Sequence, residues 1–437
     1  MGNIIGAIIA LGILVTVHEA GHFLAARWFG VEIEKFSIGF GKKLFSFKKG
    51  KTEYRISLIP LGGYVKMKGE NPDEEIVDPE HSFRGKTWWQ RAIIAFAGPF
   101  ANFVLALLLF IASFAVGRNY EDLKPVVGQV ESEYAEVFLP EDIILEVNDH
   151  PIKGWNQIIQ YSRADAENYY KVLRDSTSYE ITTPGLESMF WYSTVKPQVD
   201  AVVGEVSPGL SAFKAGLMPG DRILAVDENP VADWYEMRAM ITENPNSEVK
   251  LKIQRGEQVF DKVLKLEQNI YDDNKVIGIT QYMPVKIQEK YNLGQSISYG
   301  SITTVNFMIL NYAMFGKLIA NPQAIKSNLG GPVMIYTMSK QTVGKGWGII
   351  LSFIAAISIV LMIMNLLPIP ILDGGHIFFC FVEGIFRRPL PLKVQIILQN
   401  IGLFFLMFLM VYAFWNDFSR IFSRNASIQE QKMEMQK

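Results

Sequence analysis

The stretch His18-Glu19-Ala20-Gly21-His22 lies inside an unbroken apolar run, with residues 4–17 before it and residues 23–29 after it. The run is long enough to cross a membrane as a helix, so three ionisable side chains are placed at bilayer depth. Such groups are costly to bury in hydrocarbon and mark a functional site by default. On a helix, residues i and i+4 share one face, so His18 and His22 can bind one metal ion while Glu19 reaches its bound water. The stretch predicts a zinc hydrolase with its site inside a membrane.

The alternative is a satisfied polar cluster in an ordinary core helix, because two histidines and a glutamate at this spacing also arise by chance. The apolar surroundings favour the metal, since an unpartnered cluster would be costly to insert into a bilayer. No Lys or Arg precedes the apolar run and no small-residue cleavage site interrupts it. We therefore expect a spanning helix rather than a secretory signal.

Composition places the chain among membrane proteins with a substantial soluble part. Of its 437 residues, 49% are hydrophobic, and the formal net charge is −2. A charge this close to zero argues against a nucleic-acid partner. The single cysteine, Cys380, excludes an intrachain disulfide and a cysteine-rich metal site.

Three further stretches reach spanning length: Ala92–Val116, Gly348–Leu367 and about Ile396–Phe414. With the first stretch, they give four predicted transmembrane helices. Polar residues dilute Ile302–Ile319, for which we expect an amphipathic helix. Lys and Arg are concentrated in the loops between the first two and the last two spans, so both loops should be cytoplasmic. The two termini and the long central region would then lie on the other side.

The loop between the first two spans contains short alternating segments separated by Gly and Pro. These predict a small sheet with strands at about 32–38, 44–47, 54–58 and 64–67. The second span contains Ala97-Gly98-Pro99 and Asn102, and its small residues should let it pack closely on the histidine helix. Asn102 can form a hydrogen bond across that contact, as a packing contact or in a direct catalytic role.

The central region contains an internal repeat. Val127-Gly128-Gln129-Val130 matches Val203-Gly204-Glu205-Val206, and residues 139–144 match residues 218–223. The second copy resembles the PDZ family, whose members bind extended peptides by adding a strand to a sheet edge. Its peptide-binding turn and strand would be Ile277, Gly278 and Ile279. The first copy departs from the pattern at Glu141, where glycine is usual. Alternatively, both copies only size or shield the entrance to the site.

A catalytic zinc normally takes three protein ligands and a water, so two histidines do not complete the site. The best source of a third ligand is Asn365-Leu366-Leu367-Pro368-Ile369-Pro370-Ile371-Leu372-Asp373-Gly374-Gly375-His376. Its two prolines break the third span at membrane depth, which is tolerated only where protein or a watery cavity satisfies the backbone. We expect Asp373 to turn inward as the third ligand, with a helix cap as the alternative. His376 could be the ligand instead, although we expect it to support a ligand or to lie at the membrane interface.

The paired motifs, with the tandem repeat between the second and third spans, resemble the site-2 protease family over nearly the whole chain. The resemblance implies that His18, His22 and Asp373 bind one zinc ion and that Glu19 is the general base. It also implies that the substrate is positioned by Asn365, by the neighbouring Pro368 and Pro370, and by an edge strand formed by Tyr64, Val65, Lys66 and Met67. An edge strand suits the chemistry, because a transmembrane helix must unwind before its peptide bonds can be cut.

Substrates of this family are single-span proteins whose extracytoplasmic part has already been trimmed, such as an anti-sigma factor, and remnant signal peptides. The resemblance therefore implies regulated intramembrane proteolysis in an envelope stress response. It places the chain in the bacterial inner membrane, in contact with lipid, with the PDZ domains in the periplasm and a peptide or substrate stub as their ligand. Two other functions compete: a scaffold that presents PDZ domains without turnover, and a metal-ion transporter, for which further intramembrane carboxylates or histidines are lacking.

The predicted fold is an α-helical membrane protein with four transmembrane helices, a small membrane-associated β-sheet and two tandem α+β PDZ domains. Its predicted segments are the first span with the histidines (1–30), the sheet and loop (31–90), the second span (91–117), the two PDZ domains (123–198 and 199–285), an amphipathic region (290–345), the third span with Asp373 (346–376), the fourth span (395–415) and a tail (416–437).

Overall fold

The computed structural model describes residues 2–71, 78–131, 134–269, 274–320, 339, 342 and 345–434. These form two compact units. The helical unit contains residues 2–118, 290–316 and 345–414, and the β-rich unit contains residues 119–289. Parts of the predicted amphipathic region and tail, residues 321–338 and 435–437 among them, lie outside the described residues.

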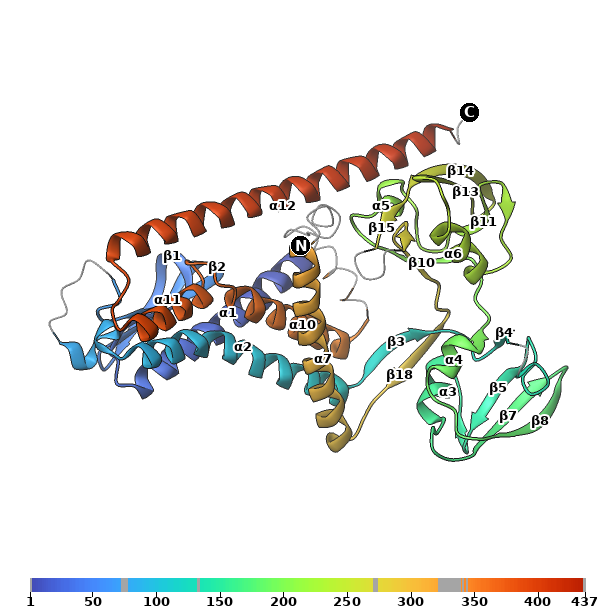
Figure 1. Cartoon of the computed structure of the whole chain (residues 1–437), viewed down its shortest axis with the longest axis horizontal. Coiled ribbons are helices and arrows are strands. Elements are labelled where there is room, and N and C mark those ends of the chain that lie inside the picture. Colours follow the sequence, from blue (N-terminus) through green and yellow to red (C-terminus); the bar gives the residue numbers. More distant parts are fainter. Residues whose placement is uncertain are drawn as a thin grey trace. The chain divides into compact units, whose positions relative to one another are not determined.

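Helix α2 (Trp88–Val116) is central to the helical unit, since α1 (Gly2–Trp28), α10 (Trp347–Asn365) and α11 (Asp373–Phe386) all pack against it (Figure 1). The contact with α1 is close: a Cβ atom on Gly21 would lie 2.2 Å from the carbonyl oxygen of Ala97. This confirms the prediction that the second apolar segment packs on the histidine helix through small residues.

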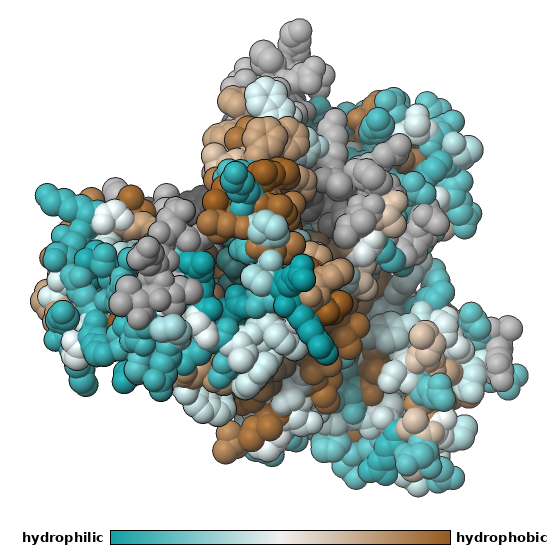
Figure 2. All heavy atoms as spheres, turned by 60° about the vertical axis from the view of Figure 1, so that its left-hand side comes forward, coloured by the Kyte–Doolittle hydropathy of each residue, from teal (hydrophilic) through white to brown (hydrophobic). Residues whose placement is uncertain are grey.

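Three described helices are long and apolar enough to cross a membrane: Trp88–Val116, Trp347–Asn365 and Leu392–Ser419. Figure 2 shows apolar side chains, in brown, gathered in patches on one face of the molecule. Helix α12 (Leu392–Glu434) runs on past the fourth predicted span, so residues 416–434 of the predicted tail are helical. Helix α1 is 27 residues long. Its membrane crossing stays a prediction, because the side chains of residues 2–9 lie outside the described part.

Strands β1 (Ile33–Lys49) and β2 (Thr52–Met67) form one bent hairpin. Each strand bends once, so the hairpin forms a sheet of four strand segments, which we call limbs. Phe36 pairs with Val65 on one side and with Tyr54 on the other, and Tyr54 also pairs with Phe47. The limbs therefore lie in the order 63–67, 33–38, 53–57 and 43–49, which correspond to the four predicted strands. Residues 63–67 form an edge of this sheet.

The third predicted span, 346–376, is not one helix. Helix α10 ends at Asn365 and α11 begins at Asp373, with both prolines between them. Proline has no N–H to donate and clashes with the preceding turn, so two prolines this close together favour a break in the helix. The chain turns back tightly here, since a Cβ atom on Gly374 would lie 2.3 Å from the carbonyl oxygen of Leu367. The turn places Asp373 in the first turn of α11, where a helix terminus favours negative charge.

The β-rich unit confirms the internal repeat. The first repeat (residues 123–198) contains a four-stranded sheet in the order β6-β5-β7-β8, and the second repeat (residues 199–285) has the same arrangement, β12-β11-β13-β14. In each repeat, a buried Asp accepts two hydrogen bonds from an Arg on the third strand of the sheet: Asp142 from Arg174, and Asp221 from Arg255. The first repeat has Glu141 at the position where the second repeat has Gly220. Both residues have a positive φ, 73° and 92°, so Glu141 adopts a backbone conformation that favours glycine.

The strands of the first repeat are β4 (Val127–Val130), β5 (Ile143–Val147), β6 (His150–Pro151), β7 (Asn168–Arg174), β8 (Thr177–Thr183) and β9 (Val195–Pro197). Those of the second are β10 (Val203–Val206), β11 (Arg222–Val226), β12 (Asn229–Pro230), β13 (Glu248–Arg255), β14 (Gln258–Lys265), β15 (Glu267–Gln268), β16 (Lys275–Val276) and β17 (Ile279–Gln281). The helices are α3 (Trp155–Tyr161), α4 (Phe190–Ser193), α5 (Ser211–Lys214) and α6 (Trp234–Thr242). Strands β3 (Arg118–Asp122) and β18 (Val285–Glu289) pair outside the repeats, and α7 (Leu293–Ala320) follows them.

Candidate metal centre

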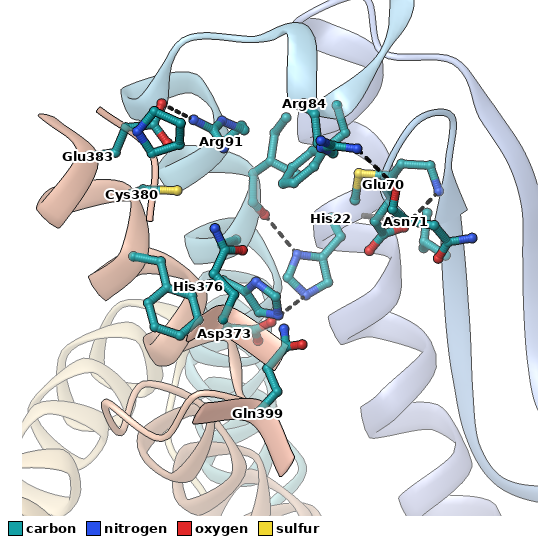
Figure 3. Close-up of a pocket in the computed structure, with 18 of the residues that line it drawn as sticks. His22, Glu70, Asn71, Arg84, Arg91, Asp373, His376, Cys380, Glu383 and Gln399 are labelled. Atoms are coloured by element: carbon teal, nitrogen blue, oxygen red, sulfur yellow. Dashed lines mark hydrogen bonds and ion pairs between the residues drawn. The ribbon is translucent and has the colours of Figure 1, made fainter. Parts of the chain in front are cut away.

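The side chains of His18, His22 and Asp373 converge in the helical unit (Figure 3). His18 Nε2 lies 3.0 Å from Asp373 Oδ2, His22 Nε2 lies 3.4 Å from Asp373 Oδ1, and the two Nε2 atoms are 3.2 Å apart. Both histidines are buried, and the Asp373 side chain is 18% exposed. The structure thus brings together the three residues predicted as ligands, from the middle of α1 and the start of α11.

This arrangement fits a zinc ion. Ligand atoms bound tetrahedrally to zinc at about 2.0–2.1 Å lie about 3.3 Å from one another. Here the two Nε2 atoms are 3.2 Å apart, and each lies 3.0–3.4 Å from one of the two carboxylate oxygens of Asp373. Asp373 Oδ2 is buried and makes no well-formed hydrogen bond, although His18 Nε2 lies within ion-pair distance. Two imidazoles and a carboxylate are a common donor set for catalytic zinc, with the fourth position left for water.

The other ring nitrogen of each histidine faces α2. His22 Nδ1 donates to the carbonyl oxygen of Ile94 at 2.7 Å, which leaves Nε2 free for a metal. His18 Nδ1 lies 3.4 Å from the side-chain amide of Asn102, whose Oδ1 is buried without a partner. An amide rotation of 180° would place Oδ1 against His18 Nδ1–H and satisfy both groups. This contact would hold the His18 ring in one orientation. Such a role is neither simple packing nor direct catalysis, the two alternatives that the sequence left open.

Gly98 of α2 lies directly against the imidazole rings of both histidines. A Cβ atom there would lie 2.3 Å from His22 Nε2 and 2.9 Å from His18 Cε1. These distances are far below van der Waals contact, and the backbone contact of His22 prevents its ring from moving aside. Only glycine leaves room for the two ligands.

Replacing Gly98 by Ala should lower zinc affinity by roughly 10–100-fold, the usual cost of disturbing residues that orient metal ligands. Zinc per chain after equilibration in a metal buffer measures the effect. Gly316→Ala in α7 is the matched control, since a Cβ atom there meets nothing within 4 Å. Equal zinc affinity for Gly98→Ala and the parent protein would contradict the geometry.

The ligands open into a cavity of about 850 Å³ within the helical unit. Glu19 lines it beside the ligands and accepts a hydrogen bond from the backbone N–H of Val65. The edge of the β1–β2 sheet forms one wall, through Tyr64, Val65 and Met67. The Glu19 carboxylate, the three converging side chains and the edge of the sheet thus line one cavity, an arrangement suited to peptide hydrolysis.

The remaining predicted site residues are placed differently. Lys66 lies on the same strand but pairs with Glu34 at 2.8 Å and does not line the cavity. Asn365, Pro368 and Pro370 are also absent from its described lining, so their contact with substrate stays a prediction.

In the second repeat, the predicted peptide-binding turn contacts the repeat's own chain. The carbonyl of Ile277 accepts the N–H of Ala212 at 2.9 Å, and that of Gly278 accepts the N–H of Ser207 at 2.8 Å. Ile279 begins β17, which pairs with β10. Peptide binding here stays a prediction.

Several polar residues in the cavity wall had no chemistry predicted from the sequence. Glu70, Arg91 and Glu383 were not singled out, and His376 had only an open role. Arg91 and Glu383 form an ion pair that joins α2 to α11. The available signal was local: Glu70 follows the predicted edge strand, and His376 follows Asp373 by one helical turn.

The chain is similar to known proteins along most of its length. The model of peptidase family M50 matches residues 6–409. The regulator of sigma-E protease RseP of Escherichia coli K12 is 35% identical over 95% of this chain and 98% of its own length. A protein of Neisseria meningitidis whose name includes the words zinc metalloprotease is 32% identical over 96% of this chain and 100% of its own length.

Among solved structures, the PDZ domain of an SdrC-like protein from Listeria monocytogenes matches with 27% identity and a TM-score of 0.18, over 20% of this chain and 93% of that domain. The family match covers most of the chain, including both motifs that supply the converging ligands. The chain is a multi-pass membrane protein, and it belongs to peptidase family M50, as a zinc metalloprotease.

Proposed function

We propose that this zinc metalloprotease cleaves peptide bonds within the transmembrane segments of single-span membrane proteins. The observation that carries the proposal is the origin of the ligands. His18 and His22 come from the interior of an apolar helix, and Asp373 follows directly on a break after the apolar helix α10. A site built this way opens at membrane depth, where its substrates are membrane segments.

In this proposal, His18, His22 and Asp373 hold one zinc ion, which when bound acts as a Lewis acid on the scissile carbonyl and activates water. Glu19 takes the proton from the attacking water and passes it to the leaving amine. The hydrogen bond from the Val65 N–H and the electrostatic attraction of His18 and His22 hold the Glu19 carboxylate at the cavity. Asn102 and the Ile94 carbonyl keep the two imidazoles in the orientation that ligation needs.

The substrate would bind as an added strand along residues 63–67 of β2. The N–H groups of Val65 and Met67 point away from β1, toward the carboxylates of Glu19 and Glu70. An unwound segment has unpaired amides and carbonyls, and the edge strand can pair with them once a substrate carbonyl replaces the Glu19 carboxylate on the Val65 N–H. Strand addition therefore provides both the affinity and the extended conformation that hydrolysis needs.

The basic loops support an orientation with the hairpin and the site toward the cytoplasmic face of a bacterial inner membrane and with the repeats and both termini in the periplasm. The relatives' name, regulator of sigma-E protease, supports an anti-sigma factor as one substrate class in envelope stress, with remnant signal peptides as another. Both repeats would be PDZ modules that bind a peptide stub or exclude bulky exported domains.

The test is cleavage of a single-span reporter by the purified full-length protein in detergent micelles. We expect hydrolysis within the membrane segment of a reporter with a short exported flank, and no hydrolysis after zinc is chelated. The same reporter carrying a folded exported domain should be cut more slowly. Zinc-loaded protein that binds the reporter but never cuts it would instead support the scaffold.

A further inference from the structure

Glu70 places a carboxylate in the wall of the catalytic cavity, just beyond the end of β2. Its Oε2 accepts the N–H of Met67 at 3.0 Å, and its own N–H donates to the Met67 carbonyl at 3.3 Å. The Glu70 side chain is exposed to the cavity that it lines. In Figure 3, Glu70 and Asn71 lie on the strand side of His22, away from Asp373. One carboxylate oxygen caps the edge strand, and the other makes no hydrogen bond with any residue that the structure describes.

The cations near this carboxylate have other partners. Arg91 pairs with Glu383, Lys66 pairs with Glu34, and Arg84 donates to the carbonyl of Asn71 at 3.3 Å. Glu70 makes no ion pair with any described residue. The protein around the cavity desolvates the Glu70 carboxyl, which raises its pKa above the ordinary value. A carboxylate in such surroundings gains from a cation brought by a ligand.

The cation would come from one end of the substrate. Gly63 lies beside Glu19, whereas Met67 packs in a cluster with Ala25 and Ala26 near the C-terminal end of α1. The edge strand therefore leads from the catalytic Glu19 toward the end of α1 that carries the basic loop. This end is cytoplasmic in the proposed topology, and the cytoplasmic flanks of membrane segments are rich in Lys and Arg.

We propose that Glu70 forms an acidic subsite that receives a Lys or Arg flanking the substrate's membrane segment on its cytoplasmic side. The inference rests on the proposed function, since it requires a membrane segment bound along β2. Glu70 then fixes the register of the added strand: its charge binds the basic flank, and the cap on Met67 ends the strand where that flank begins. Register in turn decides which bond meets Glu19.

Three reporters test the subsite, identical except for Lys, Gln or Glu at the cytoplasmic flank, in micelles where flank charge cannot alter insertion. Wild-type protein should cut the Lys reporter with kcat/KM roughly tenfold above the Gln reporter, equivalent to one ion pair in a partly desolvated site. Glu70→Gln keeps an acceptor for the Met67 N–H and should cut the Lys and Gln reporters equally. Glu70→Lys should favour the Glu reporter.

Glu80→Gln is the matched control, because it removes the same charge from an exposed residue outside the cavity lining. It should leave the preference of the wild type unchanged. An equal loss of kcat/KM on all three reporters in Glu70→Gln, with zinc content intact, would overturn the subsite and leave Glu70 as a strand cap. Zinc-loaded wild-type protein that cuts none of the reporters would instead refute the proposed function itself.

Discussion

Replacing Glu19 by Gln should abolish proteolysis while the metal site stays filled. The variant keeps the size of the side chain but removes the group that accepts the proton of the attacking water, and general base catalysis contributes roughly 10²–10⁴-fold to such rates. His18, His22 and Asp373 are untouched, so zinc per chain should equal that of the parent protein. The measurements are kcat/KM on the single-span reporter and zinc content of the same sample.

The control for this variant is Glu121→Gln, which removes the same charge from an exposed residue of β3. Glu121 lies outside the lining of the catalytic cavity, and cleavage should proceed at the parent rate. Parent-like cleavage by Glu19→Gln would refute the role of Glu19. Because the inactive variant should still bind unwound segments along β2, it can also trap natural substrates for identification of their trimmed ends.

Replacing Asp373 by Asn should empty the metal site and with it remove activity. The amide nearly matches the carboxylate in size but has no charge, and it is a far weaker zinc ligand. The loss of zinc affinity should exceed the roughly 10–100-fold that follows from mutating a residue that only supports a ligand. Competition with a zinc chelator measures the affinity, and thermal unfolding shows whether the helical unit remains folded.

A second group of possible metal ligands in the described residues supplies the control. The ligand atoms of Glu32, Asp78 and His81 lie within 4.8 Å of one another. Lys68 Nζ lies 3.2 Å from Glu32 and 2.9 Å from Asp78, so its ammonium already occupies the place of a cation. Asp78→Asn should therefore leave the zinc content at about one per chain, the number expected for a single three-ligand site. Loss of zinc in Asp78→Asn but not in Asp373→Asn would relocate the metal centre.

Several features of the fold followed from local patterns in the sequence. The spacing of His18 and His22 fixes both on one helix face, whatever surrounds them. Two prolines within three residues, at 368 and 370, favour a helix break, because each lacks an N–H and clashes with the preceding turn. The alternation and glycines of residues 32–67 predicted four strands, and the limbs of the observed sheet match them. Each of these signals depends on neighbours within a few residues.

The supporting residues of the site could not be assigned in the same way. From the sequence, packing was the favoured role for Asn102, with a direct catalytic role as the alternative; the structure places its side chain against His18. In the sequence, Gly98 is one of several small residues in a predicted span. In the structure, it lies directly against both imidazole rings. Both assignments depend on how α2 is rotated and how closely it approaches α1, and a one-dimensional pattern does not encode either quantity.

The sequence by itself determined the chemistry of this protein: two histidines and a glutamate on an apolar helix, and an aspartate after a broken span, specify a zinc peptidase through ligand type and local geometry. The tertiary structure alone decided how these parts meet. It set the separations of 3.0–3.4 Å among the ligand atoms and turned the edge of β2 toward Glu19. It also placed the carboxylate of Glu70 in the wall of the same cavity. The physical reason is that ligand identity is a local property, whereas convergence arises from packing between segments far apart in the chain.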